Sequence, residues 1–207
     1  MFRNAKVVTL AFALVVSTFV ISAPANSAER PTSVPGCAKS TAKGHVPAKV
    51  KQPTVAAKAP AKTLTITTNC GPIVISLLGA KAPITVTSIA ALANAGYYNK
   101  SLCHRLTTEG IFVLQCGDPT ASGTSGPVFN RKPWTGIPDE NLPVGETITY
   151  PAGTLAMANS GKNTNGSQFF FVYEDSALNP YYTVWGRITS GLDILQAIAG
   201  AGAAKQG

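Results

Sequence analysis

Apolar and polar residues alternate strictly where the folded part of the chain begins. In "LTITTNCGPIVISL", apolar side chains occupy every second position from Leu64 to Ile66 and again from Ile73 to Leu77. The two runs are separated by Asn-Cys-Gly-Pro, a turn-forming sequence. Because alternate side chains of a strand lie on one face, this pattern predicts a β-hairpin with one buried face.

Two later segments have helical spacing instead. "APITVTSIAALANAG" places Pro83 near the start of a helix, an apolar stripe along it and Gly96 at its end. A second helix is predicted at Leu192–Ile198, where apolar residues recur at three-residue intervals. Five further short strands are predicted at residues 102–106, 111–115, 154–158, 168–173 and 183–188. Seven short strands and two helices predict a mainly β fold, a closed or nearly closed antiparallel β-barrel capped by two α-helices.

The charge of the chain is unevenly distributed. Residues 1–63 hold nine Lys or Arg and one acidic residue, whereas residues 64–207 hold eight basic and eight acidic residues. The net charge of +8 is therefore confined to the N-terminal third. Because a nucleic-acid-binding domain carries its basic surface on the folded part, we expect no nucleic-acid partner.

Residues 1–28 form a separate segment, either a signal peptide or a membrane anchor. Arg3 and Lys6 precede an apolar run at residues 7–21, and small residues follow it, an arrangement typical of a secretory signal. The run is shorter than the ~20 residues of a spanning helix, although spanning helices tolerate some variation in length. Both interpretations predict an exported protein, secreted or tethered to the outer face of the cytoplasmic membrane.

Residues 29–62 combine Ala and Lys with five prolines and show neither helical nor strand periodicity. We predict a flexible, extended linker in front of a domain at residues 63–207, because proline and like charges keep such a segment extended. Attraction of the lysines to anionic envelope or wall polymers is an alternative role for this segment.

Four cysteines form an even set in a chain that is predicted to be exported, the condition in which disulfides are expected. Their spacing does not fit a zinc site, and the sequence allows three pairings. If Cys103 and Cys116 lie on neighbouring antiparallel strands, they can pair with each other, which leaves Cys37 to pair with Cys70. Buried thiols that remain unpaired are the alternative.

The histidine content excludes several kinds of catalytic site. His104 is the only histidine after the linker, so a zinc triad or a Ser-His-Asp arrangement lacks candidates. No pair of carboxylates stands out either, and we expect neither a metal nor a cofactor. What remains is Arg105, an apolar strand that carries Gln115, and the run at residues 157–171 that ends in three phenylalanines.

Four segments, taken in order, resemble the cyclophilin family of peptidyl-prolyl cis-trans isomerases. They are "CHRLTTEGIFVLQCGDP", "DENL", "GTLAMANSGKNTNGSQFFF" and "YYTVWGRITSGLDIL", and the resemblance extends over about residues 63–200. The leader, the basic spacer and "YPAGT" are most similar to the exported actinobacterial branch of that family. The resemblance implies a monomeric enzyme that accelerates rotation about X-Pro bonds in unfolded or extended polypeptides.

The resemblance also implies two catalytic residues. Arg105 is expected to donate a hydrogen bond to the prolyl nitrogen, and Gln115 to hold both the substrate carbonyl and Arg105. As the amide twists, its nitrogen gains a lone pair, so a donor held there stabilises the twisted state more than the planar one. Arginine suits this role because it stays protonated at every physiological pH.

Eight substrate-binding residues are implied as well, the first four as the apolar seat of the proline ring: Phe112, Val113, Phe170, Leu178, Ala158, Asn159, Gln168 and Tyr182. The backbone of Asn159 is expected to bond the peptide. Three consecutive phenylalanines at residues 169–171 cannot all face inward on one strand, because neighbours alternate faces. At least one of them is therefore expected in a groove or cleft.

The chain departs from the family pattern in several places, among them a one-residue insertion in "TTEGIF" and Val113 in place of a commonly larger Met. Ala177 stands where many members have Trp, and Tyr182 where many have His. The sequence stops at Gly207, before the closing strand usual in the family, so either the barrel lacks its last strand or the sequence is truncated. The alternative function is a non-catalytic proline-peptide-binding module or holdase chaperone. Arg105 favours catalysis, because a binder has no need of a charged donor at the prolyl nitrogen.

Overall fold

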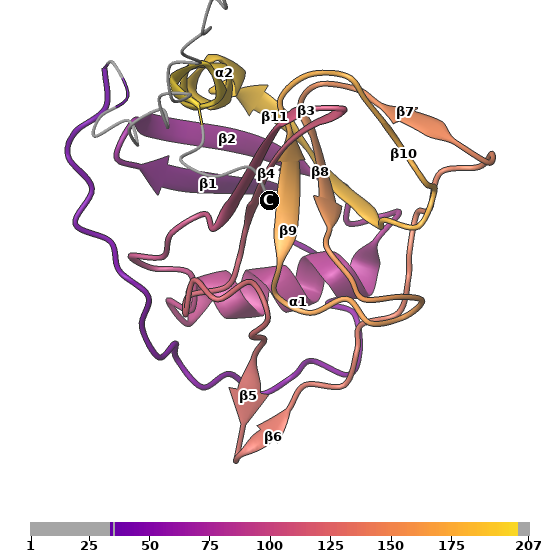
Figure 1. Ribbon diagram of the computed structural model, residues 1–207. Helices are drawn as coiled ribbons and strands as arrows, with labels where there is room; N and C mark the ends of the chain where they lie inside the picture. The colour runs from indigo at the N-terminus through magenta and orange to yellow at the C-terminus, as the bar shows by residue number, and fades with distance from the viewer. Residues whose placement is uncertain (1–33, 35, 203–207) are drawn as a thin grey trace, which may run out of the picture.

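The computed structural model describes residue 34 and residues 36–202. Its main element is a seven-stranded sheet with the order β1-β2-β11-β8-β9-β4-β3, in which neighbouring strands are antiparallel (Figure 1). These strands are β1 (Thr63–Thr68), β2 (Gly71–Leu77), β3 (Arg105–Glu109), β4 (Ile111–Cys116), β8 (Thr154–Met157), β9 (Phe169–Val172) and β11 (Val184–Ser190). Two small antiparallel sheets pair β5 (Val128–Phe129) with β6 (Lys132–Pro133) and β7 (Ile148–Tyr150) with β10 (Ser176–Leu178). The helices are α1 (Pro83–Asn94) and α2 (Leu192–Ala201).

The mainly β class and the two helices are confirmed, but the closed barrel is not. β1 and β3 are the outer strands of the seven-stranded sheet, and within the described residues neither strand pairs with the other. A barrel closes only when its edge strands bond to each other. The sheet is therefore a curled half-barrel, with α1 and α2 at its two ends (Figure 1).

The predicted elements are present with shifted ends. The strand expected at residues 102–106 lies at Arg105–Glu109 instead; residues 95–100 form a turn, in which Lys100 has a φ of 58°, and residues 101–104 have no regular structure. The short strands β5, β6, β7 and β10 were not predicted, since two or three residues are too few to show a period.

Both faces of the sheet are covered, and β8 and β9 are buried at every position. On one face, an interior cluster joins Phe169 and Phe171 to Val86 of α1 and Leu195 of α2. On the other face lies an outer cluster of Val113, Tyr150, Ala156, Phe170 and Val172, against which Leu178 and Tyr182 pack. The two clusters explain the run of three phenylalanines, because alternate residues of β9 serve opposite faces.

Glu140, in the "DENL" segment, caps α1 from outside the helix. The N–H groups of Ile84 and Thr85 donate to its two carboxylate oxygens at 3.1 and 2.8 Å, and the residue before the helix, Ala82, has no side chain that could do so. The N–H of Glu140 donates to Thr183 Oγ1 at 2.9 Å. An acidic group at a helix N-terminus is favourable, so this loop connects α1 firmly to the start of β11.

Residues 36–62 differ from the flexible linker that was expected at 29–62. They contain neither helix nor strand, but they follow the outside of the domain toward β5 and β6, as the indigo segment in Figure 1 shows. Trp134 Nε1–H donates to the Val50 carbonyl at 2.7 Å, and the side-chain amide of Gln52 exchanges two hydrogen bonds with the backbone of Thr135 at 2.7 and 2.8 Å. Val50 is itself buried. The composition of the segment did not reveal this attachment, because the partners are distant in sequence.

The favoured disulfide pairing is present. Cys37 is bonded to Cys70, which ties the N-terminal segment to the β1–β2 turn, and Cys103 is bonded to Cys116 at the end of β4. The predicted leader at residues 1–28 lies outside the described residues. Among the residues that are described, no helix has the length and apolar character needed to cross a membrane.

Candidate active site

Arg105, Gln115 and Phe170 lie in one row across the sheet. Arg105 is paired with Gln115 between β3 and β4, and Gln115 is paired with Phe170 between β4 and β9. Phe170 is in turn paired with Ala156 of β8. Directly opposed residues of antiparallel strands project to the same face, and Val113, two residues before Gln115, shares that face. The fold thus brings a guanidinium, an amide and an apolar surface together.

Phe112 lies on the opposite face. It is paired with Thr108, and its ring packs against the interior cluster, edge-on to the ring of Tyr173 at 6.0 Å. Phe112 and Val113 are consecutive on one strand, so they cannot both project toward Phe170. The structure therefore places Phe112 on the face opposite Phe170, and the apolar residues that share a cluster with Phe170 include Val113 and Leu178.

A chain of amides orients Arg105. Its Nη1 donates to Gln115 Oε1 at 3.5 Å, and Gln115 Nε2 donates to Gln168 Oε1 at 2.9 Å. Gln168 Nε2 donates to the carbonyls of Gly123 and Ser125, both at 3.0 Å. The contact with Arg105 is long and uses one of the five N–H donors of a guanidinium. Arg105 is thereby oriented while it keeps donors for a substrate.

Asp118 holds the loop that supplies these carbonyls. Its carboxylate accepts hydrogen bonds from the backbone and hydroxyl of Thr120, the hydroxyl of Ser122 and the backbone of Ser125. Burial raises the pKa of Asp118, but these hydrogen bonds outweigh burial and lower the pKa below its ordinary value. Asp118 was not among the predicted site residues. The Ser- and Thr-rich turn composition of "GDPTASGTSG" is the signal that points to it.

Three further predicted residues surround Phe170. The ring of Tyr182 meets that of Phe170 edge-on at 5.3 Å, and Leu178 and Ala158 pack against the outer cluster. Phe170 itself is 6% exposed, so little of this residue is open to a ligand. Asn159 lies to one side, where its Nδ2 donates to the carbonyl of residue 181 at 2.8 Å and fixes the segment that carries Tyr182.

A neutral histidine and a disulfide lie next to Arg105 in the sequence. Burial lowers the pKa of His104, against the opposing effect of the Asp118 carboxylate, so this histidine is neutral at pH 7 and adds no second cation beside Arg105. The Cys103–Cys116 disulfide joins the residue two before Arg105 to the residue after Gln115. This bond clamps together the ends of β3 and β4 from which the two side chains project.

The site consists of a fixed cation, two side-chain amides and an apolar surface. Such a set suits the binding of an extended peptide and the polarisation of an amide nitrogen without proton transfer. Two cavities of about 320 and 220 Å³ lie elsewhere, and Arg105, Gln115 and Phe170 line neither of them. Within the described residues, no cluster of three or more His, Cys, Asp or Glu side chains is arranged to hold a metal ion.

The comparisons with known proteins point to one family. Residues 63–206 match the family described as "Cyclophilin type peptidyl-prolyl cis-trans isomerase/CLD". The "Probable peptidyl-prolyl cis-trans isomerase B" of Mycobacterium leprae is 47% identical over 169 residues, which cover 77% of this chain and 57% of the relative. The protein of the same name from Mycobacterium tuberculosis is 46% identical over 150 residues, which cover 70% and 49%. The chain thus spans about half the length of the curated relatives it matches.

Solved structures agree with this match. A cyclophilin-type peptidyl-prolyl cis-trans isomerase from Cryptosporidium parvum aligns with a TM-score of 0.54 at 31% identity, over 65% of this chain and 82% of that chain. The same protein has been crystallised in the presence of the dipeptide Ala-Pro. The cyclophilin AquaCyp293 from Hirschia baltica, with a TM-score of 0.52 at 21% identity over 67% of each chain, shares the fold. On the sequence match and the fold together, the chain belongs to the cyclophilin-type peptidyl-prolyl cis-trans isomerase family.

Proposed function

We propose that the chain catalyses cis-trans isomerisation of X-Pro bonds in extended polypeptides. The observation that carries this proposal is the row of Arg105, Gln115 and Phe170 on the outer face of the sheet. This row combines a fixed hydrogen-bond donor with an apolar surface suited to a five-membered ring. The family and the names of the relatives support the same activity.

The reaction requires no bond to be made or broken. Rotation about the amide faces a barrier of ~18–20 kcal/mol, because the C–N bond has partial double-bond character. The twisted amide has a lone pair on its nitrogen, and a hydrogen bond from Arg105 to this nitrogen stabilises the twisted state selectively. Gln115 holds Arg105 and the substrate carbonyl in register during the rotation.

Substrate binding follows from the same arrangement. The proline ring lies against Phe170, next to Val113 and Leu178, and Tyr182 borders it. The extended chain on either side bonds to the backbone of Asn159. The Ala-Pro dipeptide present with the Cryptosporidium relative is a ligand of the class that such a site accepts.

The clients are proteins outside the cytoplasm, and the enzyme acts as a monomer. Two disulfides support this location, because such bonds persist in oxidising compartments. The leader sequence at residues 1–28 supports either secretion or a tether on the outer face of the cytoplasmic membrane.

The decisive experiment replaces Arg105 in the purified full chain and follows an Ala-Pro peptide by protease-coupled assay and by exchange NMR. Arg105→Ala is expected to lower kcat/KM by about 100-fold or more, the usual loss when one transition-state donor is removed. Arg105→Lys should not restore the rate, because an ammonium lacks the planar fork of a guanidinium. Lys132→Ala, which removes an exposed cation on β6, is the matched control and should leave the rate unchanged. If Arg105→Ala retains the full rate, the catalytic role of Arg105 is wrong. If the parent chain binds the peptide without accelerating its isomerisation, a proline-peptide-binding module is the correct function.

A further inference from the structure

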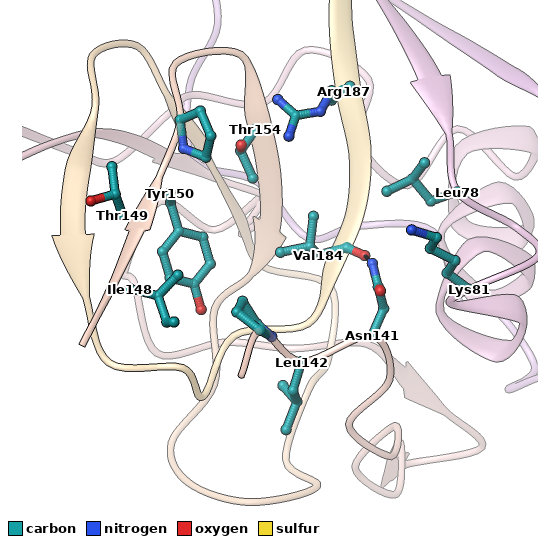
Figure 2. Close-up of a pocket in the computed structure, with 12 residues that line it drawn as sticks. Leu78, Lys81, Asn141, Leu142, Ile148, Thr149, Tyr150, Thr154, Val184 and Arg187 are labelled. Carbon is teal, nitrogen blue, oxygen red and sulfur yellow. Dashed lines mark hydrogen bonds between the residues drawn. The ribbon is translucent and has the colours of Figure 1, made fainter. Parts of the chain in front are cut away.

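The larger cavity of the structure, about 320 Å³, lies beside β7 and β11 and outside the Arg105 row. Figure 2 shows the side chains around it, which come from the turn before α1, the loop after Glu140, β7, β8 and β11. It is lined by Leu78, Lys81, Asn141, Leu142, Pro143, Ile148, Thr149, Tyr150, Pro151, Thr154, Val184 and Arg187. A volume of this size falls at the lower end of ligand-binding sites.

The lining carries two positive charges and no acidic side chain. Lys81 and Arg187 face the cavity from different elements, and within the described residues neither forms an ion pair (Figure 2). Two other polar groups of the lining are already engaged. Asn141 Nδ2 donates to the carbonyl of Val184 at 2.7 Å, and Tyr150 Oη donates to the carbonyl of residue 179 at 3.2 Å. Burial raises the pKa of Tyr150 to about 12, so this hydroxyl adds no negative charge at physiological pH.

Thr154 supplies a second, independent observation. Its side chain is 1% exposed, and its hydroxyl has no hydrogen-bond partner in the part of the chain that the structure describes. A buried hydroxyl without a partner is costly, and most such groups in proteins are paired. Thr154 on β8 is directly opposite Arg187 on β11, so both side chains project to the same face, and Figure 2 shows them next to each other. The hydroxyl oxygen is closed to solvent as the side chains stand, so a ligand oxygen at this end of the cavity bonds Arg187 and reaches Thr154 only after a local side-chain shift.

Exposed apolar side chains at the rim of the cavity indicate that its ligand is a polypeptide rather than a free small anion. Leu142 lines the cavity and is 39% exposed, and Val144, two residues further along the same loop, is 94% exposed. Exposed apolar side chains of this size next to unpaired cations are complementary to an acidic residue that has apolar neighbours.

We propose that this cavity is a carboxylate-binding subsite, which takes an aspartate or glutamate of an extended polypeptide between Lys81, Arg187 and the Thr154 hydroxyl. Apolar residues next to that acidic residue pack on Leu142 and Val144. The subsite selects substrates in which an acidic residue lies a short distance from the proline, and in this respect the inference rests on the proposed isomerase function.

Two aromatic contacts connect the subsite with the prolyl site. The ring of Tyr150, which lines the cavity, meets that of Tyr182 at 6.3 Å, and the ring of Tyr182 meets that of Phe170 at 5.3 Å. The ring centroids of Tyr150 and Phe170 therefore lie at most roughly 12 Å apart, the length of about four residues of extended chain. An acidic residue three to five positions from the proline is therefore expected to bind best.

The test measures binding and catalysis separately on the full chain. A peptide without proline, acetyl-Leu-Glu-Ala-Leu-amide (the Glu peptide), is titrated while the backbone NMR signals of residues 154 and 187 are followed. The comparison ligands are the same peptide with Gln in place of Glu (the Gln peptide) and free glutarate. The Glu peptide should shift both signals, the Gln peptide should not, and glutarate should bind more weakly. In parallel, Ala-Pro substrates with Glu or Gln placed one to six residues on either side of the proline are compared for KM. The KM should be lowest with Glu three to five residues away.

Three variants assign the effect to the cavity. Arg187→Gln and Lys81→Gln should each raise the Kd of the Glu peptide by roughly three- to tenfold, a modest range because both cations are exposed to solvent. Thr154→Val keeps the shape of the side chain and removes its unpaired hydroxyl, so it should weaken binding of the Glu peptide without lowering the urea midpoint of unfolding. Lys132→Gln, on β6, should change neither the Kd of the Glu peptide nor the urea midpoint of unfolding.

Equal binding of the Glu and Gln peptides, or an unchanged Kd in Arg187→Gln, would overturn the carboxylate subsite. Glutarate that binds as tightly as the peptide would overturn the polypeptide as its occupant. Because the peptide lacks proline, Arg105→Ala should leave its Kd unaltered. A loss of isomerase function therefore cannot be mistaken for failure of the subsite.

Discussion

Replacing Phe112 and Phe170 one at a time by leucine tests which face of the sheet binds the substrate. The two residues lie on neighbouring strands, but Phe112 belongs to the interior cluster and Phe170 to the outer one. Each makes an edge-on ring contact, Phe112 with Tyr173 at 6.0 Å and Phe170 with Tyr182 at 5.3 Å. The two phenylalanines therefore differ mainly in the face of the sheet on which their side chains pack.

Both substitutions should cost stability, and Phe112→Leu no more than Phe170→Leu, because Phe112 is only partly buried. A change from Phe to Leu keeps most of the buried volume, at a cost below about 1.5 kcal/mol, and removes a ring pair worth ~0.5–1.5 kcal/mol. We therefore expect the free energy of unfolding in urea to fall by about 1–2 kcal/mol in each variant. Only Phe170→Leu should also lower kcat/KM for an Ala-Pro peptide, by about tenfold, which corresponds to ~1.4 kcal/mol of lost transition-state stabilisation.

The assay is exchange NMR on the peptide at a temperature well below both unfolding midpoints, so that every variant is folded. A fall in kcat/KM for Phe112→Leu as large as that for Phe170→Leu would refute the assignment of Phe112 to the interior face. It would mean that the expected joint seat forms after all when substrate binds.

Two further predictions concern stability. The Cys37–Cys70 bond closes a loop with a sequence separation of 33, against 13 for Cys103–Cys116, so the Ser/Ser variant of the first pair should lose about 3.7 kcal/mol and that of the second about 2.9 kcal/mol on loop entropy. Urea unfolding checks this, and equal unfolding free energies for the first Ser/Ser variant and the parent would contradict a bond that restrains residues 36–62. For His104, burial lowers the pKa in the folded state, so between that lowered pKa and ~6.5 the unfolded chain binds more protons and stability falls as the pH drops. The urea midpoint should therefore decrease from pH 7 to pH 5.5, and it should decrease less in His104→Gln; the same decrease in both proteins would show that other groups cause it.

Local sequence was sufficient for the elements with a clear period. The hairpin of β1 and β2 follows from alternation, and the start of α1 follows from Pro83. The start of β3 was not predictable in the same way: the turn at residues 95–100 includes a positive φ at Lys100 that the residue type does not demand, and residues 101–104 after it have no regular structure. The attachment of residues 36–62 was missed for a related reason, since Trp134 and Gln52 find partners more than 80 positions away.

In the candidate site, too, some features followed from the sequence and others only from the tertiary structure. The motif residues Arg105, Gln115, Gln168 and Phe170 came from the family resemblance, and the register of β3, β4 and β9 brings them together. The sequence did not show on which face of β4 the Phe112 side chain lies, because strand pairing determines that face. Asp118 escaped notice because a carboxylate in a polar loop is ordinary until its four hydrogen bonds are seen.

By itself, the sequence determined the mainly β class, the family and the chemical character of the site, because periodicity and a long motif are properties of neighbouring residues. Only the tertiary structure decided which side of the sheet each aromatic residue serves, how Gln168 and the loop at residues 118–125 orient Arg105, and that Thr154 lies opposite Arg187 in a cavity. The physical reason is strand register: a shift of one residue exchanges the two faces of a strand, and the pairing that fixes it joins segments distant in the chain.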